Sequence, residues 1–237
     1  MELLVAEREF AAYSLSHWLV LLVFAAGAGL LVRIGRRHRS EADARRFSRV
    51  LAVAIFALYL AILLYSMVPP SIHRSVPLQL SDLASLASGY ALWSHRQWAF
   101  VLTYYWGLVL STQALVSPVL TGPDFPHYGF LAFWGIHLLV VWAAIYLTWG
   151  LGMRPGWRSY RIVVAVTVAW AAFTFTFNSL AGTNYGFLNA KPDTPSLLDV
   201  LGPWPWYLVP VIALVLGTWA LMTWPWVRSG RVDPART

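Results

Sequence analysis

The stretch Pro77-Leu-Gln-Leu-Ser-Asp-Leu-Ala-Ser-Leu-Ala-Ser-Gly-Tyr-Ala-Leu-Trp93 decides how this chain crosses a membrane. It lies between strongly hydrophobic segments but carries a polar stripe, because a helix places Ser81, Ser85 and Ser88 along one side. Asp82 lies beside that stripe. An ionisable residue at membrane depth is costly and therefore marks a candidate functional site.

The composition is that of an integral membrane protein. Of the 237 residues, 59% are hydrophobic and only 11% are charged, and there is no cysteine. Without cysteine, disulfides, thiolate nucleophiles and cysteine-ligated metals are excluded, and no other pattern predicts a metal site or a cofactor. The net charge of +7 comes mostly from arginines that flank apolar spans, so we expect no nucleic-acid binding.

Hydrophobic segments of roughly 20 residues, the length that crosses a bilayer, predict the topology. Six clear segments and one shorter segment lie at about 15–34, 48–68, 77–93, 97–119, 128–149, 160–181 and 205–227. If all seven cross, 14 of the 17 basic residues share one face, and omitting 77–93 removes this bias. We therefore predict an all-α polytopic bundle of seven transmembrane helices in a single domain (1–237), with the N-terminus outside and the C-terminus cytoplasmic.

This orientation gathers most intramembrane polar residues in the outer half of the bundle. Gln79, Ser81 and Asp82 fall within the first two turns of the third span. His137 lies roughly 15 Å below the outer end of the fifth span, and the fourth and sixth spans add Gln113 and Asn178. We expect the inner half to be almost purely apolar. The histidines at the span edges, His17, His38, His73 and His95, are expected to be solvated.

The long segment 182–206 is rich in glycine, proline and tryptophan, which is typical of an ordered cap at the membrane surface. We expect this cap to cover the polar half of the bundle. Asn184 and Tyr185 would then lie close to a bound substrate.

Acyl transfer is the chemistry that these residues could support. A serine hydroxyl needs a neighbouring base, and a buried imidazole within hydrogen-bond reach is the usual one. Ser81 is the candidate nucleophile, His137 the base and Asp82 a supporting group. Gln79, Gln113, Asn178, Asn184 and Tyr185 are the candidate substrate or oxyanion contacts.

Several motifs resemble the YwaF-like bacterial integral membrane proteins, which are related to the animal transmembrane protein 164. They are Leu78-Gln79-Leu80-Ser81-Asp82-Leu83, Gly135-Ile136-His137, Gly182-Thr183-Asn184-Tyr185, Ala190-Lys191-Pro192 and Leu201-Gly202-Pro203-Trp204-Pro205-Trp206. The resemblance covers nearly the whole chain and implies a multi-pass protein of the bacterial cytoplasmic (inner) membrane. It also implies phospholipid acyltransferase activity, with a distant similarity to the androgen-induced-gene class of membrane hydrolases.

The family pattern Pro-Leu-His-Leu-Cys-Asp differs from this chain at two positions. Gln79 stands where the family has histidine, and Ser81 stands where it has the cysteine nucleophile, while His137 matches the family histidine. The leading hypothesis is therefore a lipid acyl hydrolase or acyltransferase with a hydroxyl nucleophile and a membrane lipid as substrate. The alternatives are a small-solute transporter or receptor-like bundle, and a catalytically inactive structural protein. The oligomeric state stays open.

Overall fold

A computed structural model describes residues 8–193 and 196–229 and contains helices without any strand in those ranges. The first half comprises α1 (Leu15–Arg37), α2 (Glu41–Ser66), α3 (Leu80–Ser94), α4 (Gln97–Tyr105), the π-helical η1 (Trp106–Ser111) and α5 (Thr112–Val116). The second half comprises α6 (Tyr128–Ile145), the π-helical η2 (Tyr146–Gly150), α7 (Trp157–Ala181), the 3₁₀ turns η3 (Tyr185–Phe187) and η4 (Leu197–Leu201), and α8 (Leu208–Ser229).

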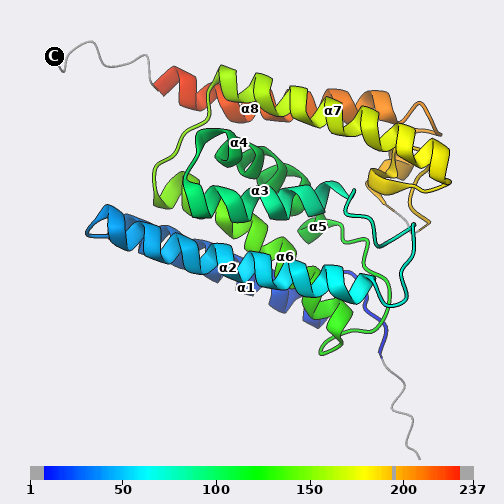
Figure 1. The fold of residues 1–237 in the computed structure, drawn as a ribbon, viewed down its shortest axis with the longest axis horizontal. Coiled ribbons are helices and arrows are strands. Elements are labelled where there is room, and N and C mark those ends of the chain that lie inside the picture. The colour runs from blue at the N-terminus through cyan, green and yellow to red at the C-terminus, as the bar shows by residue number, and fades with distance from the viewer. Residues whose placement is uncertain (1–7, 194–195, 230–237) are drawn as a thin grey trace, which may run out of the picture.

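The helices form layers in which α3, α4 and α6 lie between the pair α1 and α2 and the pair α7 and α8 (Figure 1). More than half of the apolar window is buried in the spans that contain α4 and α6, but less than a quarter in α1, α2, α7 and α8. The outer pairs therefore present their leucine, valine and phenylalanine side chains to the surroundings, as expected for helices in lipid.

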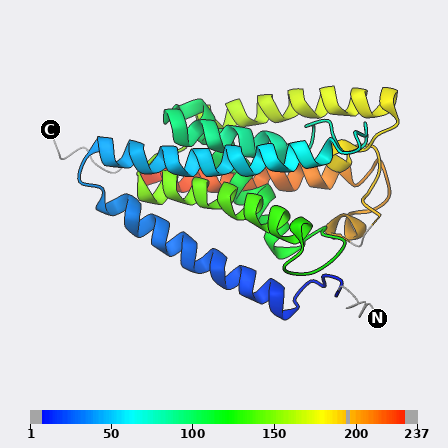
Figure 2. The same ribbon diagram turned by 60° about the horizontal axis from the view of Figure 1, so that its bottom comes forward.

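Six helices are long and apolar enough to cross a membrane, and they correspond to six of the seven predicted spans. The seventh, α3, has 15 residues, which is shorter than the roughly 20 that a span needs. It nevertheless packs lengthwise against α2 and α4. The beginning of α1 and the end of α8 lie at opposite ends of the bundle (Figure 2).

The predicted inner connection at 35–47 is shorter than expected, because α1 continues to Arg37 and α2 already begins at Glu41. Ser40 caps α2 by accepting a hydrogen bond from the Asp43 backbone N–H at 3.1 Å. Both helices therefore continue through charged residues, with Arg36 and Arg37 in the last turn of α1 and Glu41 and Asp43 in the first turn of α2.

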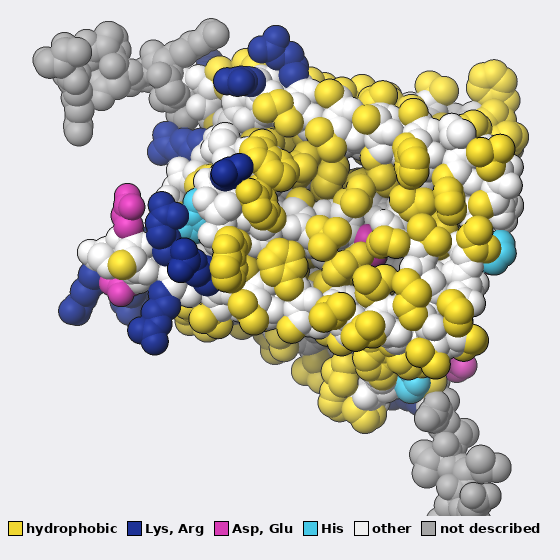
Figure 3. Space-filling view, viewed as in Figure 1, with side chains coloured by type: hydrophobic (Ala, Val, Ile, Leu, Met, Phe, Trp, Pro, Cys, Tyr) yellow, Lys and Arg dark blue, Asp and Glu magenta, His cyan; other side chains and the backbone are white. Residues whose placement is uncertain are grey.

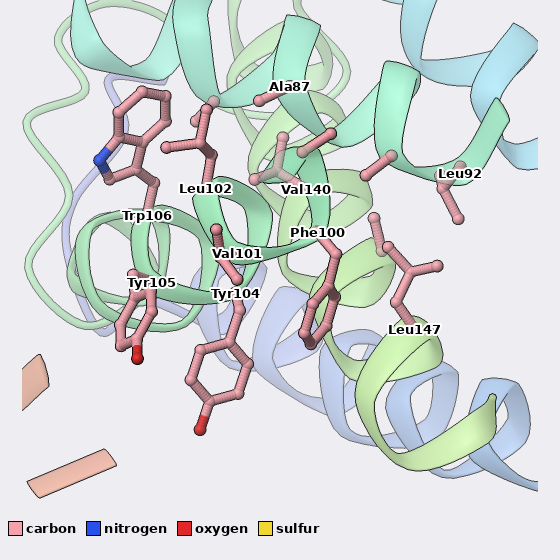
Figure 4. Packing of buried hydrophobic residues seen from close by; sticks show 14 of the residues in the cluster. Ala87, Leu92, Phe100, Val101, Leu102, Tyr104, Tyr105, Trp106, Val140 and Leu147 are labelled. Carbon is pink, nitrogen blue, oxygen red and sulfur yellow. The ribbon is translucent and has the colours of Figure 1, made fainter. Parts of the chain in front are cut away.

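The core is built where α3 meets α4 and α6. Small residues on α3, including Ala84, Ala87 and Ala91, allow the helices to approach closely. Large side chains of the neighbouring helices fill the space, and Figure 4 shows Phe100 of α4 beside Leu147 of η2. This packing holds the middle and the end of α3 within the bundle, while Ser81 in its first turn stays exposed.

Candidate functional site

The serine stripe of α3 faces the bundle. Ser85 and Ser88 are buried, with exposed fractions of 2% and 0%. Ser81 is one turn before Ser85 on the same side of the helix, but it is exposed because it lies in the first turn. The Ser85 hydroxyl donates to the Ser81 backbone carbonyl at 2.8 Å. The Ser81 hydroxyl itself forms no hydrogen bond to a described residue. Ser81 is thus the accessible end of a buried polar stripe.

Asp82 stabilises the first turn of α3. Its Oδ2 accepts a hydrogen bond from the Gln79 backbone N–H at 3.0 Å, which is the position of the carboxylate in a capping box. A negative charge here also interacts favourably with the helix dipole. Burial raises the pKa of the Tyr185 phenol in the cap, and the charge of Asp82 acts in the same direction. Asp82 is linked to the cap through Gln79, whose side chain accepts from the Gly186 N–H, and within the described ranges it forms no salt bridge.

His137 lies half-buried on α6, and its ring packs on Phe133 with the ring centres 4.4 Å apart. Its Nδ1 is 2.7 Å from the Phe133 carbonyl oxygen. Because a carbonyl only accepts, Nδ1 carries the proton and Nε2 of the neutral ring keeps its lone pair. No hydrogen bond joins Nε2 to Ser81 or to another residue in the described ranges. The predicted Ser81–His137 dyad is therefore not in direct contact.

The side-chain amide of Asn178 organises the cap, and both its donor and its acceptor atoms are hydrogen-bonded. Its Nδ2 donates to the Tyr185 carbonyl and to Asn189 Oδ1, both at 2.9 Å. Its Oδ1 accepts from the Tyr185 N–H at 2.9 Å and from the Thr183 hydroxyl at 2.8 Å. The side chain is 1% exposed. Asn178 has no donor left for an oxyanion in this arrangement, and its observed role is structural.

The remaining predicted contacts fall into two groups. Gln79 and Asn184 hold backbone in the cap: Gln79 Oε1 accepts from the Gly186 N–H at 3.0 Å, and Asn184 Nδ2 donates to the Ala190 carbonyl at 2.9 Å. Gln113, by contrast, is exposed on α5 and its side chain bonds to no residue that the structure describes. Hydrogen bonds therefore link Gln79 to Asp82 and to the cap, whereas none links Gln113 to the other candidate residues in the described ranges.

Tyr185 ties the cap to the segment before α3. Its hydroxyl donates to the Ile72 carbonyl at 2.7 Å and accepts from the Val76 N–H at 3.2 Å. On α7, the Trp170 indole N–H donates to the Leu78 carbonyl at 3.0 Å and strengthens the same connection. The loop that was predicted to be an ordered cap is thus bonded to the entry of α3 through the residues that the structure describes.

A second polar cluster lies at the opposite end of the bundle, where an almost purely apolar interior was expected. The buried Ser48 hydroxyl donates to the Ala44 carbonyl at 2.7 Å, so His95 Nε2–H donates to Ser48 Oγ at 2.9 Å. The buried Tyr146 hydroxyl is 2.9 Å from His38 Nε2 and 3.4 Å from Ser48 Oγ. Sequence reasoning missed this cluster because its members come from separate helices and share no spacing.

The expectation that His17 is solvated is also wrong. It is 0% exposed, and its ring stacks on Trp134 with the ring centres 5.0 Å apart. Nδ1 accepts from the Tyr13 N–H and Nε2 donates to the Leu115 carbonyl, both at 2.8 Å. A neutral imidazole satisfied at both nitrogens is a structural residue. Within the described ranges, no group of three or more His, Asp or Glu residues could hold a metal ion.

The basic side chains gather at the end of the bundle where α1 passes into α2, and the rest of the visible face is largely apolar (Figure 3).

Comparison with curated proteins and with solved structures gave no match. Comparison with protein-family models gave a match to the TMEM164 family over residues 12–223. Since that match spans most of the sequence, this multi-helix membrane chain belongs to the TMEM164 family.

Proposed function

We propose that the chain is a lipid acyl hydrolase or acyltransferase of the bacterial cytoplasmic membrane, with Ser81 as its nucleophile. The observation that carries the proposal is that Ser81 is exposed in the first turn of α3 while the rest of its stripe is buried. The first backbone N–H groups of a helix favour negative charge nearby, which suits the oxyanion of an acyl-transfer intermediate. Asp82 acts by fixing that turn.

In the proposed orientation the α1–α2 connection is cytoplasmic and the N-terminus is outside. Helix α3 crosses the membrane as the third of seven spans. Two observations support this orientation: the basic side chains gather at the end of the bundle that holds this connection, and the beginning of α1 and the end of α8 lie at opposite ends (Figures 2 and 3). Ser81 would then meet the ester groups of lipids in the outer leaflet. Gln79, Asn184 and Tyr185 would border the substrate as parts of the cap.

The proposed reaction begins when the Ser81 hydroxyl proton passes to His137 Nε2 through a bridging water. Ser81 Oγ bonds to the ester carbonyl carbon, and the ester C–O bond breaks as the leaving alcohol takes the proton. Water or a second lipid alcohol then takes the acyl group from Ser81 and restores the hydroxyl. The unprotonated Nε2 supports His137 as this base.

A structural, non-catalytic role is the second candidate. The observation that favours it is the missing hydrogen bond between Ser81 and His137 in the described chain. The amide of Asn178 is also entirely used in holding the cap. A protein of this kind would keep the fold of the family and would not react with acyl-directed probes.

The test is labelling of the full chain in phosphatidylglycerol and phosphatidylethanolamine nanodiscs with a lipid-like fluorophosphonate. We expect labelling of the peptide that contains Ser81, and its loss in Ser81→Ala and His137→Gln. Ser179→Ala removes an exposed serine that bonds only within α7 and to the cap, and it should keep the labelling. Labelling that is unchanged in Ser81→Ala, or absent from the wild type, would reject this nucleophile.

Ser81→Cys offers a second readout, because the natural chain has no other thiol. A helix N-terminus lowers the pKa of a cysteine, so this thiol should react with iodoacetamide at lower pH than the thiol of Ser179→Cys. Equal pH dependence of the two thiols would contradict an activating environment at position 81.

A further inference from the structure

An open groove of about 610 Å³ lies along α2 near the basic end of the bundle. Its lining includes three arginines, two valines and one tryptophan: Arg45, Arg46, Arg49, Val50, Val53 and Trp93. The valines and the tryptophan are about half exposed. The groove is thus charged toward the end of α2 and apolar toward the middle of the bundle.

The arginines in this groove are available for a ligand. Within the described ranges, the one salt bridge is between Lys191 and Asp199 at the other end, so Arg45, Arg46 and Arg49 form no ion pair there. Guanidinium groups bind phosphate through two parallel hydrogen bonds, which makes arginine well suited to phosphate recognition.

Trp93 of α3 gives the groove a fixed wall. The Arg49 guanidinium carbon lies 5.4 Å from the centre of the Trp93 ring, within the range of a cation–π interaction. This contact holds Arg49 in the groove.

The order of groups along the groove matches a phospholipid. Val50 is one residue beyond Arg49, and Val53 is one turn further toward the middle of the helix. A phosphate at the arginines would therefore place an attached acyl chain on the valines. We propose that this groove binds an anionic glycerophospholipid, with its phosphate on Arg45 and Arg49 and an acyl chain along Val50 and Val53.

The bound lipid would influence the buried polar cluster at the same end through the charges of the arginines. After burial, the charges of Arg45 and Arg49 are the main causes that lower the pKa of His95. His95 in turn donates to Ser48. An anion on the arginines offsets the repulsion among their like charges, and a ligand that binds only the folded chain stabilises it. The lipid therefore acts as a structural ligand, distant from Ser81 and independent of any acyl chemistry there.

The test measures lipid binding to the full chain in a neutral detergent, by native mass spectrometry and by the midpoint of thermal unfolding. The probes are dioleoylphosphatidylglycerol, dioleoylphosphatidylcholine and inorganic phosphate. We expect phosphatidylglycerol to remain bound and to raise the midpoint, and the other two to do neither. Stabilisation by inorganic phosphate alone would assign the site to a free anion, and equal stabilisation by phosphatidylcholine would remove the role of charge.

The variant Arg45→Ala/Arg46→Ala/Arg49→Ala should weaken phosphatidylglycerol binding by about tenfold or more, because each basic residue near an anionic lipid contributes measurably to affinity. The matched control Arg33→Ala/Arg158→Ala/Arg161→Ala removes the same charge from exposed arginines that do not line the groove. It should keep the binding.

Trp93→Ala tests the groove at constant charge and should weaken binding severalfold. If the control triple variant lost as much affinity as the groove variant, the attraction would be diffuse and the proposed site would be rejected.

Discussion

The amide of Asn178 provides the sharpest test of how the cap is held. In Asn178→Ala, the N–H and the carbonyl of the buried Tyr185 lose their partners. A buried polar group left unpaired costs about 1 to 3 kcal/mol. The partners at Thr183 and Asn189 can turn toward water, so we expect the two Tyr185 groups to dominate. The expected loss in free energy of unfolding is about 2 to 5 kcal/mol.

The loss can be measured by equilibrium unfolding in mixed micelles as the fraction of sodium dodecyl sulfate increases. Limited proteolysis gives a second readout, because Tyr185 also bonds to Ile72 and a released cap exposes the backbone of 182–190. Cleavage within 182–190 should become faster in the variant, while cleavage in the α1–α2 connection should not change.

Thr176→Ala is the matched control. Thr176 is exposed on the same helix, and its hydroxyl donates only to the Ala172 carbonyl at 2.9 Å. Its removal should change the free energy of unfolding by less than about 0.5 kcal/mol. If Asn178→Ala lost less than about 1 kcal/mol, or no more than the control, the buried amide would not be what holds the cap.

Three further perturbations test other parts of the fold. Burial and nearby arginines lower the pKa of His95 below 6.5, so the unfolded chain binds more protons than the folded chain and stability falls as the pH drops through 6.5. The variant His95→Asn should reduce this loss of stability in thermal scans from about pH 7.5 to 5.5, and asparagine suits the left-handed backbone at this position. Gly35→Ala would place Cβ 2.5 Å from the Cα of Gly150 and should cost about 1 to 3 kcal/mol, whereas Gly29→Ala meets nothing within 4 Å and should be near neutral in the same unfolding assay. His17→Ala leaves a cavity and two unpaired backbone groups and should lower the free energy of unfolding by about 2 to 4 kcal/mol in that assay; a loss below about 1 kcal/mol would contradict the structural role.

The long spans could be predicted from the sequence because hydropathy over about 20 residues is a local property. Their ends were less predictable, since the Ser40 cap and the solvated charges extend α1 and α2 past the apolar region. Helix α3 is different, because neither its length nor its apolar character marks it as a span. It was found from the distribution of arginines, and its small residues show why it packs inside the bundle.

The candidate site was only partly predictable. Polar residues in apolar helices can be recognised, and the stripe that begins at Ser81 does face the bundle. Whether such a residue is free or fully hydrogen-bonded depends on the partners that the fold brings to it. Asn178 and Tyr185 find their partners in the cap, and His95 finds Ser48 on another helix. No spacing rule within one helix carries that information.

The two polar regions differ in a way that bears on where chemistry can occur. At the basic end, the hydroxyls of Ser48 and Tyr146 are buried and hydrogen-bonded, so neither is available to a lipid without local unfolding. Near the cap, Ser81 is exposed, its hydroxyl bonds to no residue that the structure describes, and Asp82 holds its turn in place. A reacting group must be both accessible and positioned, and only Ser81 of these hydroxyls meets both conditions. The proposed acyl chemistry therefore fits the first turn of α3 and not the buried hydroxyls of the basic end, where the proposed lipid site lies.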